Sequence, residues 1–149
     1  DGIHRFRRVT DITEIGKMWE EDPLIEGGFT TLFKYNVATD TLEPTPELIN
    51  GESEVLKMIA GNIKELAGDW GAVWENIELR GKIKEELVKV AEKTKDDDLL
   101  EAPFVIKSND QFHLASELVQ RETGKLDSKK IFFEWNEWFQ RELKKRKVS

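Results

Sequence analysis

Hydrophobic and polar residues alternate near the start of the chain and recur at helical spacing further on. Residues 29–37 place Phe, Thr, Tyr and Val side chains at every odd position, which is the period expected of a β-strand with one apolar face. β-Branched residues are dense in residues 9–15, which predicts an earlier strand, and the acidic residues 20–22 with Pro23 and Gly27-Gly28 predict a flexible acidic loop between the two strands. Residues 41–43 predict a short third strand that Pro44 and Pro46 end. Residues 1–46 are therefore expected to form a small antiparallel β-meander.

Beyond residue 52, apolar side chains recur every three or four positions, which is the spacing of amphipathic helices. Helices are predicted over residues 53–67, over about 25 residues that follow Asp69, over residues 109–123 and over a stretch that follows Asp127. The predicted fold class is α+β and mostly α, in which the β-meander precedes a helical module of about four helices in residues 47–149.

Capping residues predict where these helices begin and end. Ser53 has the side chain that most often caps a helix N-terminus, and Gly68 and Gly124 are the residue type that ends helices. Residues 95–98 are Lys followed by three Asp, and they interrupt the apolar period, so they predict a loop between helices.

Composition is that of a soluble protein with a heavily charged surface. The chain has 149 residues, of which 38% are hydrophobic and 36% charged, and this length suffices for an independent core. Its formal net charge of −7 opposes nucleic acid as a partner. No apolar run approaches the length of a transmembrane helix, and the absence of cysteine is typical of a reducing cytoplasm. A cytoplasmic location is therefore expected.

The sequence offers no catalytic, cofactor-binding or metal-binding residue. None of its Gly-Lys pairs has the upstream glycine and the following Ser or Thr of a phosphate-binding loop. The two histidines, His4 and His113, lie far apart, and a zinc site needs three or four ligands. Asp96-Asp97-Asp98 with Glu101 lacks the spacing and the glycine of a calcium loop. We therefore expect no cofactor in this chain and no enzymatic activity of the chain by itself.

The candidate interaction residues lie at the two ends of the chain. Trp135, Trp138 and Phe139 follow one face of the last predicted helix, where such a stripe forms either a buried core or, if partly exposed, an anchor for a partner. Arg7 and Arg8 belong to a basic cluster in the first strand region and are expected to serve packing or subunit contact.

The first strand carries the pattern Arg-Arg-Val-x-x-Ile-x-Glu-Ile over residues 7–15. An aromatic strand with Leu32-Phe33-Lys34-Tyr35-Asn36 and the turn residues Thr39-Asp40 follow it. This succession resembles the last strands of the motor core in the secretion-superfamily ATPases (the secretion protein E superfamily), and its archaeal branch in particular. These proteins drive type II and type IV secretion and the assembly of type IV pili and archaeal flagella. The resemblance extends to about residue 95.

The resemblance implies a non-catalytic C-terminal region of such a motor, which would hold subunits together or connect ring movement to the membrane. The opening on a strand, without an initiator Met, is expected of a piece of a longer protein. Its partners would be the remainder of the ATPase, neighbouring subunits and a membrane platform protein. ATP and Mg²⁺ would belong to the parent motor.

Three other interpretations stay open at this point. The chain can be an independent, mostly helical interaction protein that binds through its aromatic helix or through its basic end, residues 141–147. A winged-helix-like nucleic-acid-binding domain fits the element types but not the acidity. An enzyme in its own right is the weakest alternative, because no catalytic arrangement is visible.

Overall fold

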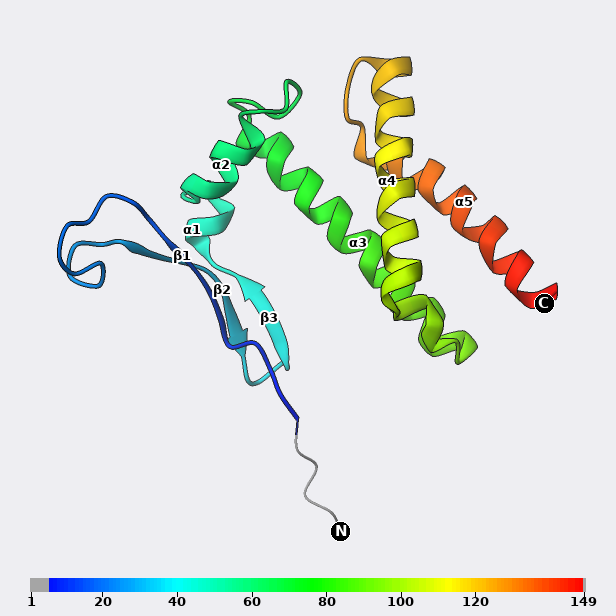
Figure 1. The fold of residues 1–149 in the computed structure, drawn as a ribbon, viewed down its shortest axis with the longest axis horizontal. Helices are drawn as coiled ribbons and strands as arrows, with labels where there is room; N and C mark the ends of the chain where they lie inside the picture. Colours follow the sequence, from blue (N-terminus) through cyan, green and yellow to red (C-terminus); the bar gives the residue numbers. More distant parts are fainter. Residues whose placement is uncertain (1–5, 149) are drawn as a thin grey trace, which may run out of the picture. The chain divides into compact units, whose positions relative to one another are not determined.

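The computed structural model describes residues 6–148 (Figure 1). A three-stranded antiparallel sheet is followed by helices, which confirms the predicted α+β, mostly helical fold class. The chain divides into two compact units, the first ending at Trp70 and the second beginning at Gly71. The sheet and the first two helices thus share one unit, whereas the sequence analysis groups those helices with the rest of the helical module in residues 47–149.

The sheet has the strand order β1-β2-β3, from β1 (Asp11–Ile15), β2 (Phe29–Asn36) and β3 (Thr41–Pro44). All neighbours are antiparallel, so the predicted meander is confirmed.

The alternation predicted for residues 29–37 is not uniform along the strand. Ile12 pairs with Phe33, but the next residue, Thr13, pairs with Thr31, so Leu32 is an extra residue in the register. Because one extra residue shifts the in–out alternation, β2 does not present a single aromatic face. Val37 lies beyond the strand, in the β2–β3 turn, and is exposed.

A short helix that the sequence analysis did not predict, α1 (Pro46–Ile49), follows the sheet. Thr45 caps it: its Oγ1 accepts a bond from the Leu48 amide and donates to the Thr31 carbonyl, which attaches the helix to β2. Proline fits the first turn because its missing N–H would have no partner there. The same property led the sequence analysis to use Pro46 only as the end of a strand.

Helix α2 (Glu54–Ala60) begins where predicted and ends early. The Ser53 hydroxyl accepts a bond from the Leu56 amide, as expected of the cap. The helix was predicted to continue to residue 67, but it stops at Gly61, and residues 61–68 form turns. Backbone bonds there are short-range, such as Ile63 N–H to the Ala60 carbonyl. Glycine weakens a helix interior, so the continuing apolar period is insufficient to hold this segment in a helix.

The second unit contains α3 (Trp70–Thr94), apart from its first residue, with the 3₁₀ helix η1 (Asp97–Leu100), α4 (Ala102–Thr123) and α5 (Ser128–Val148). Helix α3 has 25 residues, as predicted. Helix α4 begins seven residues earlier than the predicted Asn109, with Pro103 in its first turn. Gly124 ends α4 in the left-handed conformation (φ 73°) and Asp127 accepts a bond from the Lys130 amide, which confirms both predicted caps.

The core of the second unit joins all three long helices. Helix α3 supplies aliphatic side chains, α4 supplies a mixture of aromatic and small ones, and α5 supplies most of the aromatic ones. These residues are Leu79, Ile83, Leu87, Ala91, Leu99, Phe104, Phe112, Ala115, Val119, Ile131, Trp135, Trp138 and Phe139. Leu118 follows the apolar period of residues 109–123, which predicts an inward side chain, but it is exposed. No helix in the described part of the chain is long and apolar enough to cross a membrane.

Candidate functional site

The strongest candidate site is an apolar surface at the end of the β1–β2 hairpin. Ile15 and Phe29 form the last pair of that hairpin, and the loop of residues 16–28 joins them. Large hydrophobic side chains are exposed on both strands and along the loop. They are Ile15, Met18, Trp19, Leu24, Ile25 and Phe29, which we call the hairpin surface.

Exposure on the hairpin surface is high for side chains of this kind. Met18 is 86% exposed, Ile25 82% and Leu24 76%. Single exposed hydrophobic residues are ordinary, whereas a contiguous exposed apolar patch marks an interaction site. Six exposed hydrophobic side chains within fifteen residues make this hairpin the candidate for such a patch. The first unit buries only a few hydrophobic side chains. Among the described residues these are Leu32, Leu48, Ala60 and Leu66.

Hydrogen bonds hold the loop in a defined conformation. The Glu26 carboxylate accepts bonds from the backbone amides of Glu20, Glu21 and Asp22 at 2.8–3.0 Å. The hydrogen bonds from these amides, of which the Asp22 bond has the largest effect, lower the pKa of Glu26 because they favour its charged form. The Gly16 amide donates to the Gly28 carbonyl at 2.7 Å and closes the base of the loop.

Trp19 lies at the base of the loop. Its indole N–H donates to the Gly16 carbonyl at 2.8 Å, and a Cβ at Gly28 would approach the Trp19 ring to 2.8 Å. Glycine is therefore required at position 28 for the ring to lie across the backbone. In this conformation of the loop, the side chains of Met18, Leu24 and Ile25 are exposed to solvent.

On the same hairpin, Glu14 connects the sheet to α2. Its carboxylate accepts bonds from the Ser53 hydroxyl at 2.5 Å and from the amides of Glu54 and Val55 at 2.9 and 3.2 Å. A carboxylate at a helix N-terminus satisfies backbone donors and complements the helix dipole. This residue, the Glu of the Arg-Arg-Val-x-x-Ile-x-Glu-Ile pattern, therefore has a structural role.

The predicted contact residue Arg8 is engaged within the chain. Its guanidinium binds both carboxylate oxygens of Asp40, at 2.6 and 2.8 Å, and the Tyr35 hydroxyl donates to the same carboxylate at 2.7 Å. The bonds from Arg8 and then Tyr35 hold the pKa of Asp40 well below its usual range. Arg8 thus ties the segment before β1 to the β2–β3 turn. Arg7 is exposed.

The aromatic stripe of α5 lies in the core of the second unit. Trp135 and Phe139 are completely buried and stack at 5.0 Å between ring centroids, and Trp138 is 9% exposed. The Trp135 indole N–H donates to the buried Ser108 hydroxyl at 3.1 Å. An interaction role would require these three side chains to be partly exposed, and all three are buried. The aromatic side chain that α5 exposes is Phe133.

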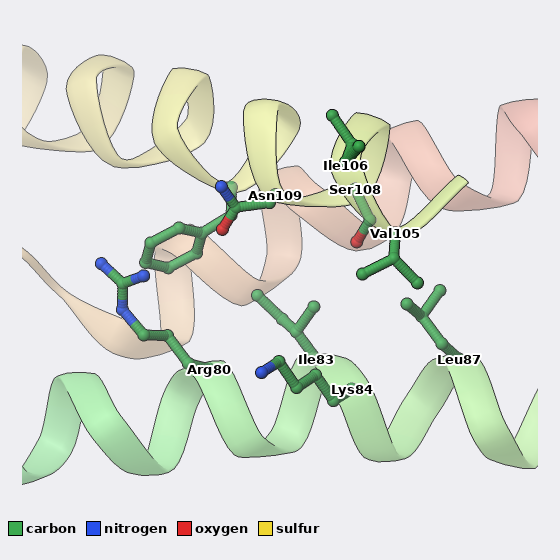
Figure 2. Close-up of a pocket in the computed structure, with 9 residues that line it drawn as sticks. Arg80, Ile83, Lys84, Leu87, Val105, Ile106, Ser108 and Asn109 are labelled. Atoms are coloured by element: carbon green, nitrogen blue, oxygen red, sulfur yellow. The ribbon is translucent and has the colours of Figure 1, made fainter. Parts of the chain in front are cut away.

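A hollow of about 330 Å³ lies between α3 and α4 of the second unit (Figure 2). Its walls are mainly apolar, from Ile83 and Leu87 on α3 and from Val105, Ile106 and Phe112 on α4. Arg80 and Lys84 bring positive charge to its α3 side, as Figure 2 shows. We call this hollow the α3–α4 groove.

Arg80 is the unusual member of the groove. Its guanidinium lies over the Phe112 ring, 4.5 Å from the centroid, and its Nε donates to the Asn76 side chain. The side chain is exposed overall, but the part of it that lies against Phe112 loses some hydration, and this partial desolvation lowers the pKa of Arg80. No carboxylate of residues 6–148 forms an ion pair with it.

The residues considered for metal binding do not gather. His113 is exposed on α4, and His4 lies outside the described residues. Asp96 accepts two bonds from Arg146 at 2.8 Å, so the acidic run is partly ion-paired. Within residues 6–148 no three His, Cys, Asp or Glu side chains form a group that could hold a metal ion.

Sequence reasoning missed both surfaces. Met18, Leu24 and Ile25 lie in a segment that it treated only as an acidic loop, although three large hydrophobic residues among acids are themselves a signal of a presented surface. Arg80 interrupts the apolar side of a long helix four residues before Lys84, which is the corresponding signal for the groove.

Comparison with models of protein families, with curated proteins and with solved structures found no match to this chain. The resemblance to the secretion ATPases therefore depends on the residues of the first two-thirds of the chain.

Proposed function

We propose that this chain is a non-catalytic protein-interaction region, and that its first unit docks onto another protein through the hairpin surface. The observation that carries the proposal is the exposure of Met18, Leu24 and Ile25 on a loop held in place by Glu26. Ordering the loop before contact reduces the entropy lost on binding, and burying aliphatic side chains contributes about 25 cal/mol per Å² of apolar area.

The charge of the hairpin loop indicates which kind of partner would bind it. Glu20, Glu21 and Asp22 lie in the same loop, between Trp19 and Leu24 in the sequence, and give the loop negative charge. An anionic membrane would repel this charge, whereas a protein with an apolar pocket and basic residues beside it would complement it. We therefore favour a protein partner over a lipid surface.

The resemblance supports a particular setting for this contact. A C-terminal region of a secretion or pilus-assembly ATPase would dock onto the remainder of the motor or a neighbouring subunit, at the inner face of the membrane. A membrane platform protein is a further partner in that setting, and ATP and Mg²⁺ would bind to the motor core. The alternative of an independent helical interaction module is supported by the separate core of the second unit.

Site-specific crosslinking tests the proposal. The chain has no cysteine, so a single Cys at Ile25 can carry a benzophenone label without background. Val37→Cys is a matched control, because Val37 is 80% exposed in a turn of the same unit but lies outside the hairpin surface. Labelled chains are added to an extract of the source cells, irradiated, and the adducts identified by mass spectrometry.

We expect the Ile25 label, and not the Val37 label, to capture a protein that carries a phosphate-binding loop of the type Gly-x-x-x-x-Gly-Lys-Ser/Thr. Equal labelling from both positions would overturn the docking role of the hairpin surface. Specific capture of a protein without such a loop would keep the docking role and overturn the motor setting.

A further inference from the structure

The α3–α4 groove combines three features that suit it to binding a ligand. It is hollow, with about 330 Å³ of space, which is at the lower end of the range for ligand-binding pockets. Its walls are largely apolar. Its charged members, Arg80 and Lys84, are both cationic, so the groove has a definite electrostatic preference for a negative group.

Arg80 is the groove cation that is best placed to meet a negative group. The residue is exposed, so an incoming group can reach its guanidinium, which lies against one face of the Phe112 ring. Its contacts with the Phe112 ring and the Asn76 amide oxygen are both to uncharged groups. A carboxylate brought to this position would form a charge-assisted, bidentate contact that the chain itself does not supply among its described residues.

The apolar surface continues beyond the hollow. Ile106 lines the groove and is 61% exposed. Val88 lies one helical turn beyond Lys84 on the same side of α3 and is also exposed. A ligand confined to the hollow would contact Ile106 but leave Val88 in water, so the apolar surface fits a ligand longer than the hollow.

We propose that the α3–α4 groove binds a helical segment of a partner protein, one that places aliphatic side chains in the hollow and a carboxylate on Arg80. Helix-in-groove recognition uses apolar anchors at helical spacing, which match an apolar hollow extended by Val88 and Ile106. Lys84 adds long-range attraction for an acidic segment. This site belongs to the second unit and is independent of the hairpin surface.

Two synthetic peptides test the proposal. The first is a capped, alanine-based helical peptide with Leu at i, i+4 and i+7 and Glu beside these positions. The second has Gln in place of every such Glu. Each is titrated into the uniformly ¹⁵N-labelled chain, amide shifts locate the binding site, and the shift changes give Kd.

We expect the Glu peptide to shift amides of α3 and α4 around the groove and to bind about tenfold or more tightly than the Gln peptide, as is typical of a charged hydrogen bond. Arg80→Gln should reduce the affinity for the Glu peptide to that for the Gln peptide. Arg121→Gln removes an exposed positive charge from α4 outside the groove and should leave both affinities unchanged.

Lys84→Gln keeps the test decisive if Arg80→Gln disturbs folding. It removes a groove charge without touching the Phe112 contact, and it should weaken binding of the Glu peptide only. The absence of localised shifts with either peptide would overturn the proposal. Equal affinity for both peptides would also overturn the proposal. Shifts produced by 4-phenylbutyrate while neither peptide binds would overturn it too, because they would indicate a pocket for small molecules.

Discussion

Trp135→Ala distinguishes a core residue from an interface residue in the aromatic stripe of α5. Trp135 is completely buried and contacts the rings of Phe132, Trp138 and Phe139 at centroid separations of 5.0–6.2 Å. Truncation of a buried Trp to Ala costs about 3–5 kcal/mol, because apolar contacts are lost and a cavity remains. The substitution also leaves the Ser108 hydroxyl buried without the indole donor, which adds about 1 kcal/mol.

These magnitudes are large compared with the total stability of a small domain, which is about 5–15 kcal/mol. Trp135→Ala alone should therefore destabilise the second unit strongly, and combining it with Trp138→Ala should leave the unit unfolded at room temperature. Phe133→Ala is the matched control on the same helix, because Phe133 is 60% exposed, and its cost should stay within about 0.5 kcal/mol.

Urea denaturation of the full chain, followed by circular dichroism at 222 nm, measures these differences. Circular dichroism is preferred to tryptophan fluorescence because the substitution removes a fluorophore. A loss below about 1 kcal/mol for Trp135→Ala, with an unchanged m-value, would refute the assignment of the stripe to the core. It would return Trp135, Trp138 and Phe139 to the status of interface candidates.

Three further predictions concern the first unit and α3. Glu14→Ala should lower the free energy of unfolding by about 1–3 kcal/mol and raise amide exchange at the start of α2, since three donors lose their acceptor; unchanged exchange in α2 would contradict the capping role. Folding lowers the pKa of Glu26 from its ordinary value of 4.5. The stabilisation that the charged carboxylate gives the loop is therefore present above pH 4.5 and is lost as the pH falls through the lowered pKa of the folded state. The protection factors of amides 20–22, which correct each exchange rate for its intrinsic dependence on pH, should therefore fall in acid in the wild type. Glu26→Gln should give low protection factors at every pH, and wild-type protection that does not change with pH would contradict this. Gly81→Ala should stabilise the chain by about 0.4–1 kcal/mol in the same urea assay, because Gly81 lies inside α3 and a Cβ there meets no atom within 4 Å; any destabilisation would show that position 81 is not open.

Local signals in the sequence determined much of the fold. The meander follows from alternation and β-branched residues, and α3 follows from an apolar period sustained over 25 residues. The caps at Ser53, Gly124 and Asp127 were predictable because each depends on atoms only a few residues apart. The aromatic stripe of α5 was visible as well, as a choice between core and interface.

Only the tertiary structure decided which apolar residues are buried. Trp135 and Leu118 both occupy apolar positions of helices, yet one is enclosed by three helices and the other is exposed. The hairpin surface and the α3–α4 groove depend on contacts between distant residues, such as Arg80 with Phe112, and helical or strand periodicity contains no information about such partners. The sequence by itself determined where elements form, because propensity and capping act locally; packing determined which surfaces remain open, because burial depends on the whole fold.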